Sequence, residues 1–422
     1  MTPPAAFPGR MSNLSAGNRD ESRREQLKVQ LRALGGRADG RSWPAGMIDV
    51  MREAGCFRAA VPREFGGDRL DTPGRAAIYE NVASGYLAAA LILTQHDGAC
   101  ELLAGCQNRE LAERVLTDVA AGRVLATVGI SQLTTSRQGG STPALAASAA
   151  KGTGGYRLDG VMPWVTSAPY ADCIVTGAVL EDGMQILAYV PADAPGLTIE
   201  PPIEFCALTD SHTCQVRCDG VVVPPERLMR PPCSEALARR SPIKSLTVSM
   251  VGIGVARALV DAMNGMDSMD GMDGTDVAGP AGRGDGRHPR QRPAGPGDGA
   301  HLRQQPATPA DGPPPRRRLA AQPPELQPFA ELARRRFEET RRRLLDAAAG
   351  LERSEAEVPA MTLRAEVNAL VQKLAATYLT LAKGSGYVSS HVAQRLLREA
   401  AFFLVWSAPT QVQAQTLRRV WT

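Results

Sequence analysis

Residues 155–178 read GYRLDGVMPWVTSAPYADCIVTGA, and this stretch decides the fold class. It holds two runs rich in Val, Ile and Thr, which favour strands, on either side of a Ser-Ala-Pro turn. Three further runs follow: MQILAYVPA, LTIEPPI and CQVRCDGVVVP. Gly, Asp and Pro turns separate them at the spacing of about 8–12 residues that is typical of all-β domains. We therefore expect a small antiparallel β domain over residues 123–230.

Both flanks of this region have a helical pattern. Residues 23–122 carry apolar side chains at i, i+3 and i+4 with Gly or Pro stops, as in RAAIYENVASGYLAAALILTQHDGACELLAG. Residues 231–422 return to the same pattern, as in LRAEVNALVQKLAATYLTLAKGSG. The predicted fold class is α+β, with an N-terminal helical domain, a central antiparallel β domain and a C-terminal helical bundle.

Two segments do not follow this pattern. Residues 1–22 are polar, and we expect a disordered tail there. Residues 265–328 contain 12 Pro and 11 Gly and almost no Val, Ile, Phe or Tyr. Such a segment cannot bury enough apolar surface to offset its chain entropy. We expect a disordered insertion in the C-terminal domain, arising either as a genuine insertion or from a shifted reading frame.

Composition excludes several classes of function. The 48 basic and 44 acidic residues leave a net charge of +4, and aromatic residues make up 5%, which argues against a nucleic-acid partner or an anionic membrane surface. The sequence has no run of 18 apolar residues and no signal-peptide-like start, so we expect a soluble, cytoplasmic protein with no membrane partner. The eight cysteines form no C-x-x-C pair and the five histidines share no ligand spacing, so we expect reduced thiols and no metal.

Three stretches together resemble the acyl-CoA dehydrogenase family of flavoproteins. They are residues 52–71 (REAGCFRAAVPREFGGDRLD), residues 155–178, and residues 385–413 (SGYVSSHVAQRLLREAAFFLVWSAPTQVQ). The resemblance implies FAD as the cofactor, and oxidation of the CH–CH group of an acyl thioester such as an acyl-CoA. It also implies a homo-oligomer and an electron-transfer flavoprotein as partner.

The same resemblance implies a set of cofactor-binding residues. Trp164 offers a flat surface to the flavin ring, and Thr166 and Ser167 follow as hydrogen-bonding groups; packing of this Trp under a hairpin is the alternative. The family's T-E-P-x-x-G-S-D loop is kept only in part, at three positions that also fit an ordinary turn: Thr135, Gly140 and Ser141.

The C-terminal stretch supplies the other candidates. Gly384 and Gly386 stand at a helix break where the family's glycines approach the dinucleotide of a neighbouring subunit, although a left-handed helix stop needs the same residues. Gln411 completes the predicted cofactor set. Arg395 and Arg398 match the family's R-x-x-R run, for which we expect a structural role.

The catalytic base is absent from both places where the resemblance puts it. The Glu that follows the last long helix is replaced by Ser407, whose hydroxyl is not a base near neutral pH. The other place, on the first helix of the C-terminal domain, holds Lys244 and Ser245. The family's pyrophosphate-binding Arg is also not found. The catalytic residue is therefore left unassigned, and His96 and His391 are expected to be structural.

Three functional hypotheses remain open. The first is an oxidoreductase of the acyl-CoA dehydrogenase type with an altered site. The second is a flavin-dependent monooxygenase of the same fold, which needs no base for the α-proton. The third is an inactive or degraded paralogue, or the base-lacking subunit of a hetero-oligomer.

Overall fold

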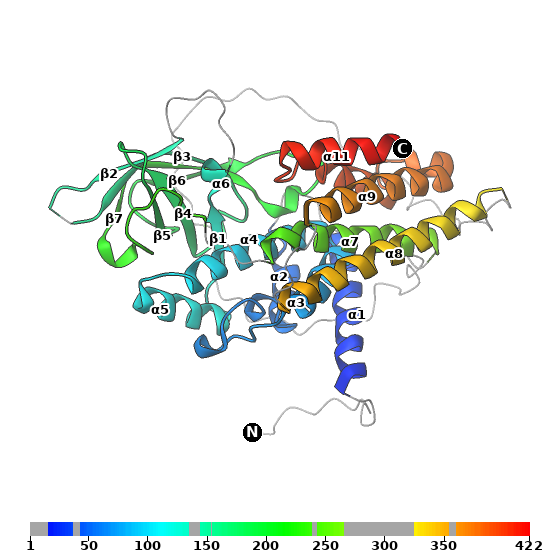
Figure 1. The fold of residues 1–422 in the computed structure, drawn as a ribbon, viewed down its shortest axis with the longest axis horizontal. Helices are drawn as coiled ribbons and strands as arrows, with labels where there is room; N and C mark the ends of the chain where they lie inside the picture. Colours follow the sequence, from blue (N-terminus) through cyan, green and yellow to red (C-terminus); the bar gives the residue numbers. More distant parts are fainter. Residues whose placement is uncertain are drawn as a thin grey trace, which may run out of the picture.

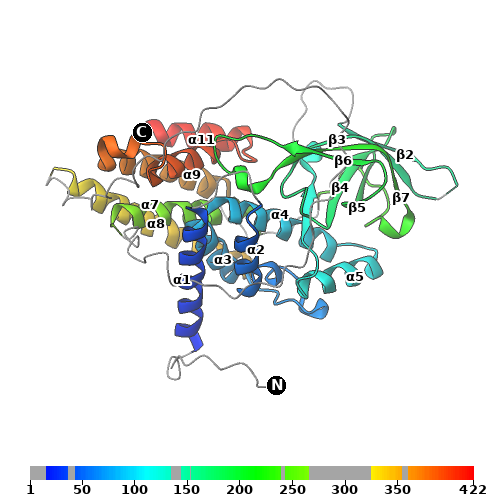
Figure 2. The same ribbon diagram turned by 180° about the vertical axis from the view of Figure 1, so that it is seen from behind.

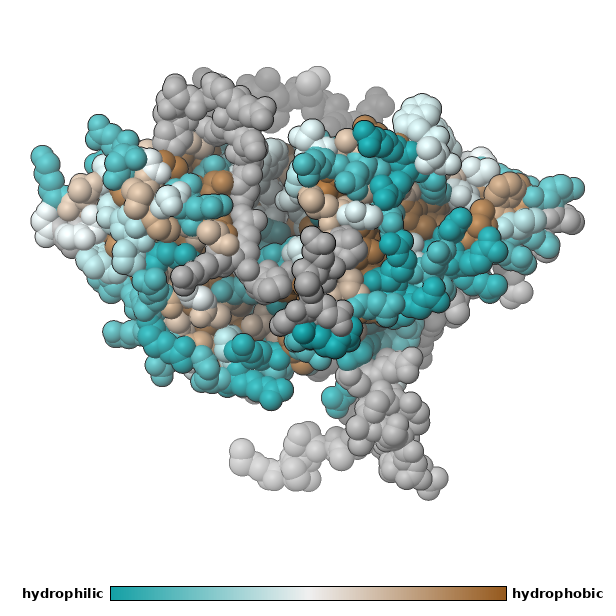
Figure 3. All heavy atoms as spheres, viewed as in Figure 1, coloured by the Kyte–Doolittle hydropathy of each residue, from teal (hydrophilic) through white to brown (hydrophobic). Residues whose placement is uncertain are grey.

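The computed structural model describes residues 16–36, 43–134, 144–152, 154–238, 243–265, 325–353 and 360–422. A twisted sheet occupies one end of the molecule and most of the helices lie toward the other, as Figures 1 and 2 show from opposite sides. The chain passes from helices to the sheet and back to helices, so the predicted fold class is confirmed. The face shown in Figure 3 is largely hydrophilic, with patches of hydrophobic residues among the hydrophilic ones.

The N-terminal helices pack as predicted around an apolar core. Their bounds are α1 Ala16–Gly35, α2 Ala45–Glu53, α3 Thr72–Gly85, α4 Leu87–Ala104 and α5 Arg109–Ala120. Helix α3 begins where the side chain of Asp71 accepts a 2.8 Å hydrogen bond from the backbone N–H of Gly74. Helix α1 begins at Ala16, inside the segment predicted as a tail. Apolar periodicity missed this start because the first turns are polar.

Seven strands form the sheet. Their bounds are β1 Ala126–Gly129, β2 Leu145–Ala149, β3 Tyr156–Val165, β4 Cys173–Val179, β5 Gln185–Pro191, β6 Leu197–Pro202 and β7 Cys214–Val223. The order is β1-β4-β2-β3-β7-β6, and β5 pairs with β4. The pairs β2–β3, β3–β7, β4–β5 and β6–β7 are antiparallel as predicted, whereas β1 and β2 both run parallel to β4.

The C-terminal helices build on one buried helix, α7. The bounds are α7 Lys244–Met263, α8 Gln327–Glu352, α9 Ala360–Ala382, α10 Val392–Phe402 and α11 Thr410–Trp421. A Cβ at Gly254 would lie 2.6 Å from the carbonyl oxygen of Glu80, so only glycine permits the close approach of α7 to α3. By length and composition α7 is the one described helix that could cross a membrane, and 89% of its apolar window is buried within the protein.

The predicted insertion falls mostly outside the described residues. Residues 266–324 lie there, so the expected disorder remains a prediction. The predicted end at residue 328 is two residues too late, because α8 begins at Gln327. Pro328 stands in the first turn of α8, where a missing backbone N–H costs no intrahelical hydrogen bond.

Candidate functional site

The predicted aromatic platform stands on the surface of the sheet near the end of β3. Trp164 is 53% exposed, which is unusual for so large an aromatic side chain, and its ring stacks at 6.2 Å between centroids on Phe205. The pairing of β3 with β7 shifts register between Met162 and Val165. Such an irregularity changes the direction of side chains along a strand. Trp164 therefore presents a flat face outward while its neighbour Val165 stays buried.

Thr166 connects this platform to two neighbouring segments. Its carbonyl accepts a 2.8 Å hydrogen bond from the hydroxyl of Thr127 in β1. Its own hydroxyl lies 3.1 Å from that of Thr213, which lies 2.9 Å from the hydroxyl of Ser211. Thr166 is buried, so the hydroxyl predicted to reach the ring edge belongs to a row of three hydroxyls within the protein.

Ser167 and His212 are two polar residues with strained backbones near the end of the Trp164 strand. Both have left-handed backbones, with φ of 60° at Ser167 and 44° at His212. The Ser167 N–H donates a 2.9 Å hydrogen bond to the carbonyl of Ser211, so the two segments lie side by side. Both side chains are buried, yet Ser167 Oγ and His212 Nε2 have no hydrogen-bond partner among the residues that the structure describes.

Unpartnered buried polar atoms and left-handed backbones both destabilise the folded protein, so they are unusual in a segment with only a structural role. An unsatisfied buried polar group costs about 1–3 kcal/mol, and a left-handed backbone at a residue other than Gly costs about 1–3 kcal/mol as well. Two such residues on hydrogen-bonded segments, near the end of the strand that carries an exposed Trp, suit a planar ligand that carries polar edges. An isoalloxazine ring is a ligand of that kind.

His212 is a site residue that the sequence reasoning missed. Its ring lies edge-on to the stacked rings of Trp43 and Tyr170, with centroids 5.7 and 5.3 Å away. The sequence feature that could have indicated His212 is the segment TDSHT, immediately before β7. Only the pairing of Val165 with Cys214 brings this segment to the end of the Trp164 strand, and that register cannot be read from the sequence.

The loop predicted to contact the flavin follows β1 and a short helix, α6 (Ser131–Thr134). Thr135, Gly140 and Ser141 lie outside the described residues, so their roles stay predictions. The entrance to the loop is fixed by Gln132. Its side-chain amide donates hydrogen bonds of 2.8 and 2.9 Å to the carbonyls of Gly129 and Gly177, and thereby anchors α6 to β1 and β4.

The glycines predicted at the C-terminal helix break are placed differently from expectation. The left-handed backbone falls on Lys383, with φ of 53°, and on neither Gly384 nor Gly386. Gly386 is needed instead for close packing, because a Cβ there would lie 2.7 Å from the Cβ of Ala382. Gly384 is exposed and its missing Cβ would meet no atom within 4 Å.

The segment between α10 and α11 carries the position expected for a catalytic Glu. Ser407 there is exposed, with φ of 44°, and Pro409 precedes the first residue of α11. Gln411 is exposed on α11. The other expected base position is Lys244, the first residue of α7. The structure thus places no carboxylate at either residue position.

His96 and His391 have the contacts expected of structural residues. His96 is fully buried, with Nδ1 3.2 Å from the carbonyl of Ala126 and Nε2 3.0 Å from that of Phe57, and burial lowers its pKa below the usual value. His391 caps α10 by accepting a 3.1 Å hydrogen bond from the backbone N–H of Ala393.

Arg395 also has the structural contacts expected for it. Its guanidinium lies 5.1 Å from the ring centre of Tyr86, and its Nε lies 3.9 Å from the carboxylate of Glu399. Glu399 is buried, and the loss of hydration raises the pKa of its carboxyl group. These contacts join α10 to the start of α4.

Cysteine placement agrees with the expectation of reduced thiols. Five of the eight are buried, and all eight are free. Cys106 lies two residues beyond the end of α4. In the described parts of the chain, no three His, Cys, Asp or Glu side chains gather as metal ligands.

Comparisons with known proteins support this fold. Residues 24–123 match the family model described as acyl-CoA dehydrogenase, N-terminal domain. The probable acyl-CoA dehydrogenase YngJ of Bacillus subtilis is 27% identical over 229 residues, which span 52% of this chain and 59% of that relative. The match thus spans little more than half of the relative's own length.

Two solved structures show the shared fold. The glutaryl-CoA dehydrogenase–glutaryl-CoA complex superposes with a TM-score of 0.71 at 17% identity, covering 97% of this chain and 96% of that one. FMN-bound TdsC of Paenibacillus sp. A11-2, described as a dibenzothiophene monooxygenase, superposes with a TM-score of 0.72 at 15% identity, covering 95% and 96%. Residues 24–123 thus match an acyl-CoA dehydrogenase N-terminal domain, and the whole chain has the fold of the acyl-CoA dehydrogenases.

Proposed function

We propose that this chain binds a flavin against Trp164 and uses it to oxidise a small molecule. The observation that carries the proposal is the combination of an exposed Trp with two buried, unpartnered polar atoms near the end of its strand. Similarity to a family of flavin-dependent oxidoreductases supports the same conclusion. When bound, the flavin supplies the two-electron chemistry.

The residues present have distinct roles in this proposal. Trp164 holds one face of the ring, and Ser167 Oγ and His212 Nε2 are the hydrogen-bonding groups available at its edge. Their positions are fixed beforehand by the row of hydroxyls from Thr166 to Ser211. Preorganised donors of this kind favour a bound ligand because they need no rearrangement when it arrives.

The first candidate reaction is oxidation of the CH–CH group of an acyl thioester, with FAD as the hydride acceptor. It is supported by similarity to a probable acyl-CoA dehydrogenase and to the glutaryl-CoA complex. A residue other than Ser407 must then remove the α-proton, because a serine hydroxyl is not a base near neutral pH. We include in this proposal a homo-oligomer, an electron-transfer flavoprotein as acceptor and a cytoplasmic location.

The second candidate is flavin-dependent oxygenation, which needs no base for an α-proton. The observation in its favour is that the two expected base positions hold Ser407, exposed on a left-handed backbone, and Lys244. The fold similarity to the dibenzothiophene monooxygenase is compatible with this reaction. An inactive paralogue, or a subunit that borrows its base from a partner, is the remaining alternative.

One pair of experiments separates these functions. The full chain is loaded with FAD or FMN and mixed with acyl-CoAs in the absence of oxygen. Loss of the visible flavin band shows dehydrogenation. If the band persists, the flavin is reduced chemically and exposed to air with candidate aromatic substrates, where hydroxylated product identifies a monooxygenase. A chain that binds neither flavin contradicts the proposal as a whole.

A further inference from the structure

A buried cluster of charged residues lies where α3, α4 and α7 meet, and the function proposed above does not use it. Arg75 and Tyr79 come from α3, Asp97 and Glu101 from α4, and Lys244 from the start of α7. Two cations and two anions balance each other. This balance matters because an unpaired charge buried in the interior of a protein costs roughly several kcal/mol.

The charged side chains of the cluster form a row in which negative and positive charges alternate. Asp97 Oδ2 accepts hydrogen bonds from Tyr79 at 2.5 Å and from Arg75 at 3.3 Å. Arg75 Nη1 lies 2.6 Å from Glu101 Oε1, and Glu101 Oε2 lies 3.5 Å from Lys244 Nζ. Burial alone would lower the pKa of Arg75, but Tyr79, Asp97 and Glu101 raise it, so the guanidinium stays charged.

Lys244 stands at the exposed end of this row of charged side chains. Its side chain is 29% exposed, whereas those of Glu101, Arg75 and Asp97 are 11, 8 and 3% exposed. No hydrogen bond from Lys244 Nζ to another described residue is present, and Glu101 Oε2 accepts none. The ion pair with Glu101 therefore holds the ammonium in place and leaves N–H donors for a further acceptor.

The ammonium lies beside the strand that supports the flavin hairpin. A Cβ at Gly98 would lie 3.1 Å from Lys244 Nζ and 3.6 Å from Val128 Cγ1, so the absence of a side chain at Gly98 leaves room for the lysine next to β1. Thr127, adjacent to Val128, donates the hydrogen bond to the carbonyl of Thr166. Lys244 thus reaches the junction of helices and sheet from the helical side.

We propose that Lys244 is a substrate-binding residue, and that it donates hydrogen bonds to a carboxylate of a small anionic substrate. The exposed end of the cluster is cationic, and its donors are unspent. A saturated hydrocarbon chain in this place would remove water from the ammonium and offer no hydrogen bonds in its place, which is unfavourable. The inference rests on the proposed function, because it treats the Trp164 hairpin as the other wall of the same site.

The test compares two thioesters of equal carbon number, glutaryl-CoA with a terminal carboxylate and pentanoyl-CoA without one. Binding to the flavin-loaded full chain is measured by titration calorimetry. We expect glutaryl-CoA to bind about tenfold more tightly or better, in line with a charged hydrogen bond. Lys244→Met removes this preference, and Lys244→Arg retains most of it. Lys373→Met, at an exposed lysine of α9, is the matched control and leaves it unchanged.

The outcomes separate this inference from the proposed function. An equal preference in wild type and Lys244→Met overturns the inference, even if flavin binds and reacts. If neither thioester binds, free glutarate and pentanoate are titrated instead. Lys244-dependent binding of glutarate then supports the inference and removes CoA from the proposed function, whereas no such binding overturns the inference. Circular dichroism confirms that each variant is folded.

Discussion

Ser167 and Ser407 have left-handed backbones in two regions that the family resemblance assigns to the same site, and their surroundings are opposite. Ser167, with φ of 60°, is buried at the Trp164 hairpin, and backbone hydrogen bonds to its neighbours hold it. Ser407, with φ of 44°, is exposed between α10 and α11. The β domain keeps a preorganised polar site, whereas the C-terminal turn keeps the strained backbone without a functional carboxylate.

This difference indicates which part of the family's chemistry the chain retains. In the proposed function, cofactor binding depends on the hairpin, where aromatic surface and buried polar atoms are present together. Proton removal depends on the C-terminal turn, where Ser407 stands in place of a Glu. We therefore expect substitutions in the hairpin to change flavin binding, and substitutions in the turn to change only stability.

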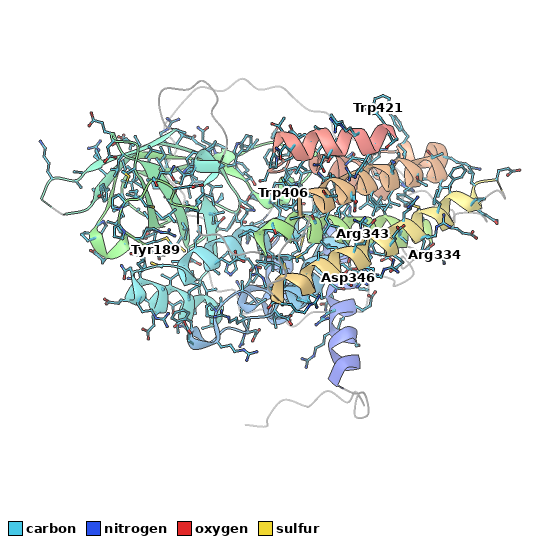
Figure 4. The ribbon with its side chains drawn as sticks, in the orientation of Figure 1. Tyr189, Arg334, Arg343, Asp346, Trp406 and Trp421 are labelled. Atoms are coloured by element: carbon cyan, nitrogen blue, oxygen red, sulfur yellow. The ribbon has the colours of Figure 1, made fainter. Side chains whose placement is uncertain are left out.

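The largest effect is expected from Trp164→Ala. Aromatic stacking contributes about 0.5–1.5 kcal/mol beyond the buried area, so with the lost contact area flavin binding weakens by about tenfold or more. Trp421→Ala is the matched control, because Trp421 is 85% exposed and points away from the body of the molecule in Figure 4. Dissociation constants for FAD and FMN come from flavin fluorescence titrations. Equal affinities in the two variants would remove the hairpin from the site.

A smaller effect separates the two serines. Ser407→Gly relieves a left-handed backbone and raises the free energy of unfolding by about 1 kcal/mol, with flavin binding unchanged. Ser167→Gly gives the same relief and also removes an unpartnered hydroxyl, so the flavin-free protein becomes more stable while flavin binding weakens. Denaturant unfolding and flavin titration measure the two quantities. If Ser167→Gly leaves flavin affinity intact, its hydroxyl is not a ligand.

The smallest effect concerns pH and Glu399, which lies beneath the C-terminal turn. Burial raises the pKa of this carboxyl, while Arg395 and Arg398 lower it and Asp210 raises it further. Above the unfolded pKa of about 4.3, the unfolded chain releases this proton and the folded chain retains it. Stability therefore falls as pH rises from that value through the folded pKa.

Glu399→Gln should flatten this slope. The measurement is the denaturation midpoint across the acidic to neutral range, and Glu338→Gln, at an exposed position on α8, is the control. A slope that survives in Glu399→Gln assigns the pH dependence to another group.

The sequence predicts the part of this site that is continuous in the chain. Trp164, Thr166 and Ser167 are adjacent, so one strand pattern places all three together. His212 joins them only through the pairing of β3 with β7, and Glu101 meets Lys244 only through the packing of α4 against α7. Neither contact leaves a periodic signal in the sequence.

Local backbone geometry limits the prediction in a second way. Glycine is the residue that most readily adopts positive φ, so Gly384 and Gly386 were the natural choices for the helix stop. The structure places this conformation on Lys383, because Gly386 is needed for contact with Ala382. Gly386 packs against residues only four and seven positions before it, and glycine content alone does not show which residue takes the positive φ.

The central claim is that the chain binds flavin at the Trp164 hairpin, and the visible absorption spectrum tests it most directly. The full chain is purified, supplemented with FAD or FMN and separated from free cofactor by gel filtration. We predict that the wild-type protein retains a flavin band in equimolar amount and that Trp164→Ala loses most of it. Wild-type protein that stays colourless after saturation with both flavins would contradict the claim.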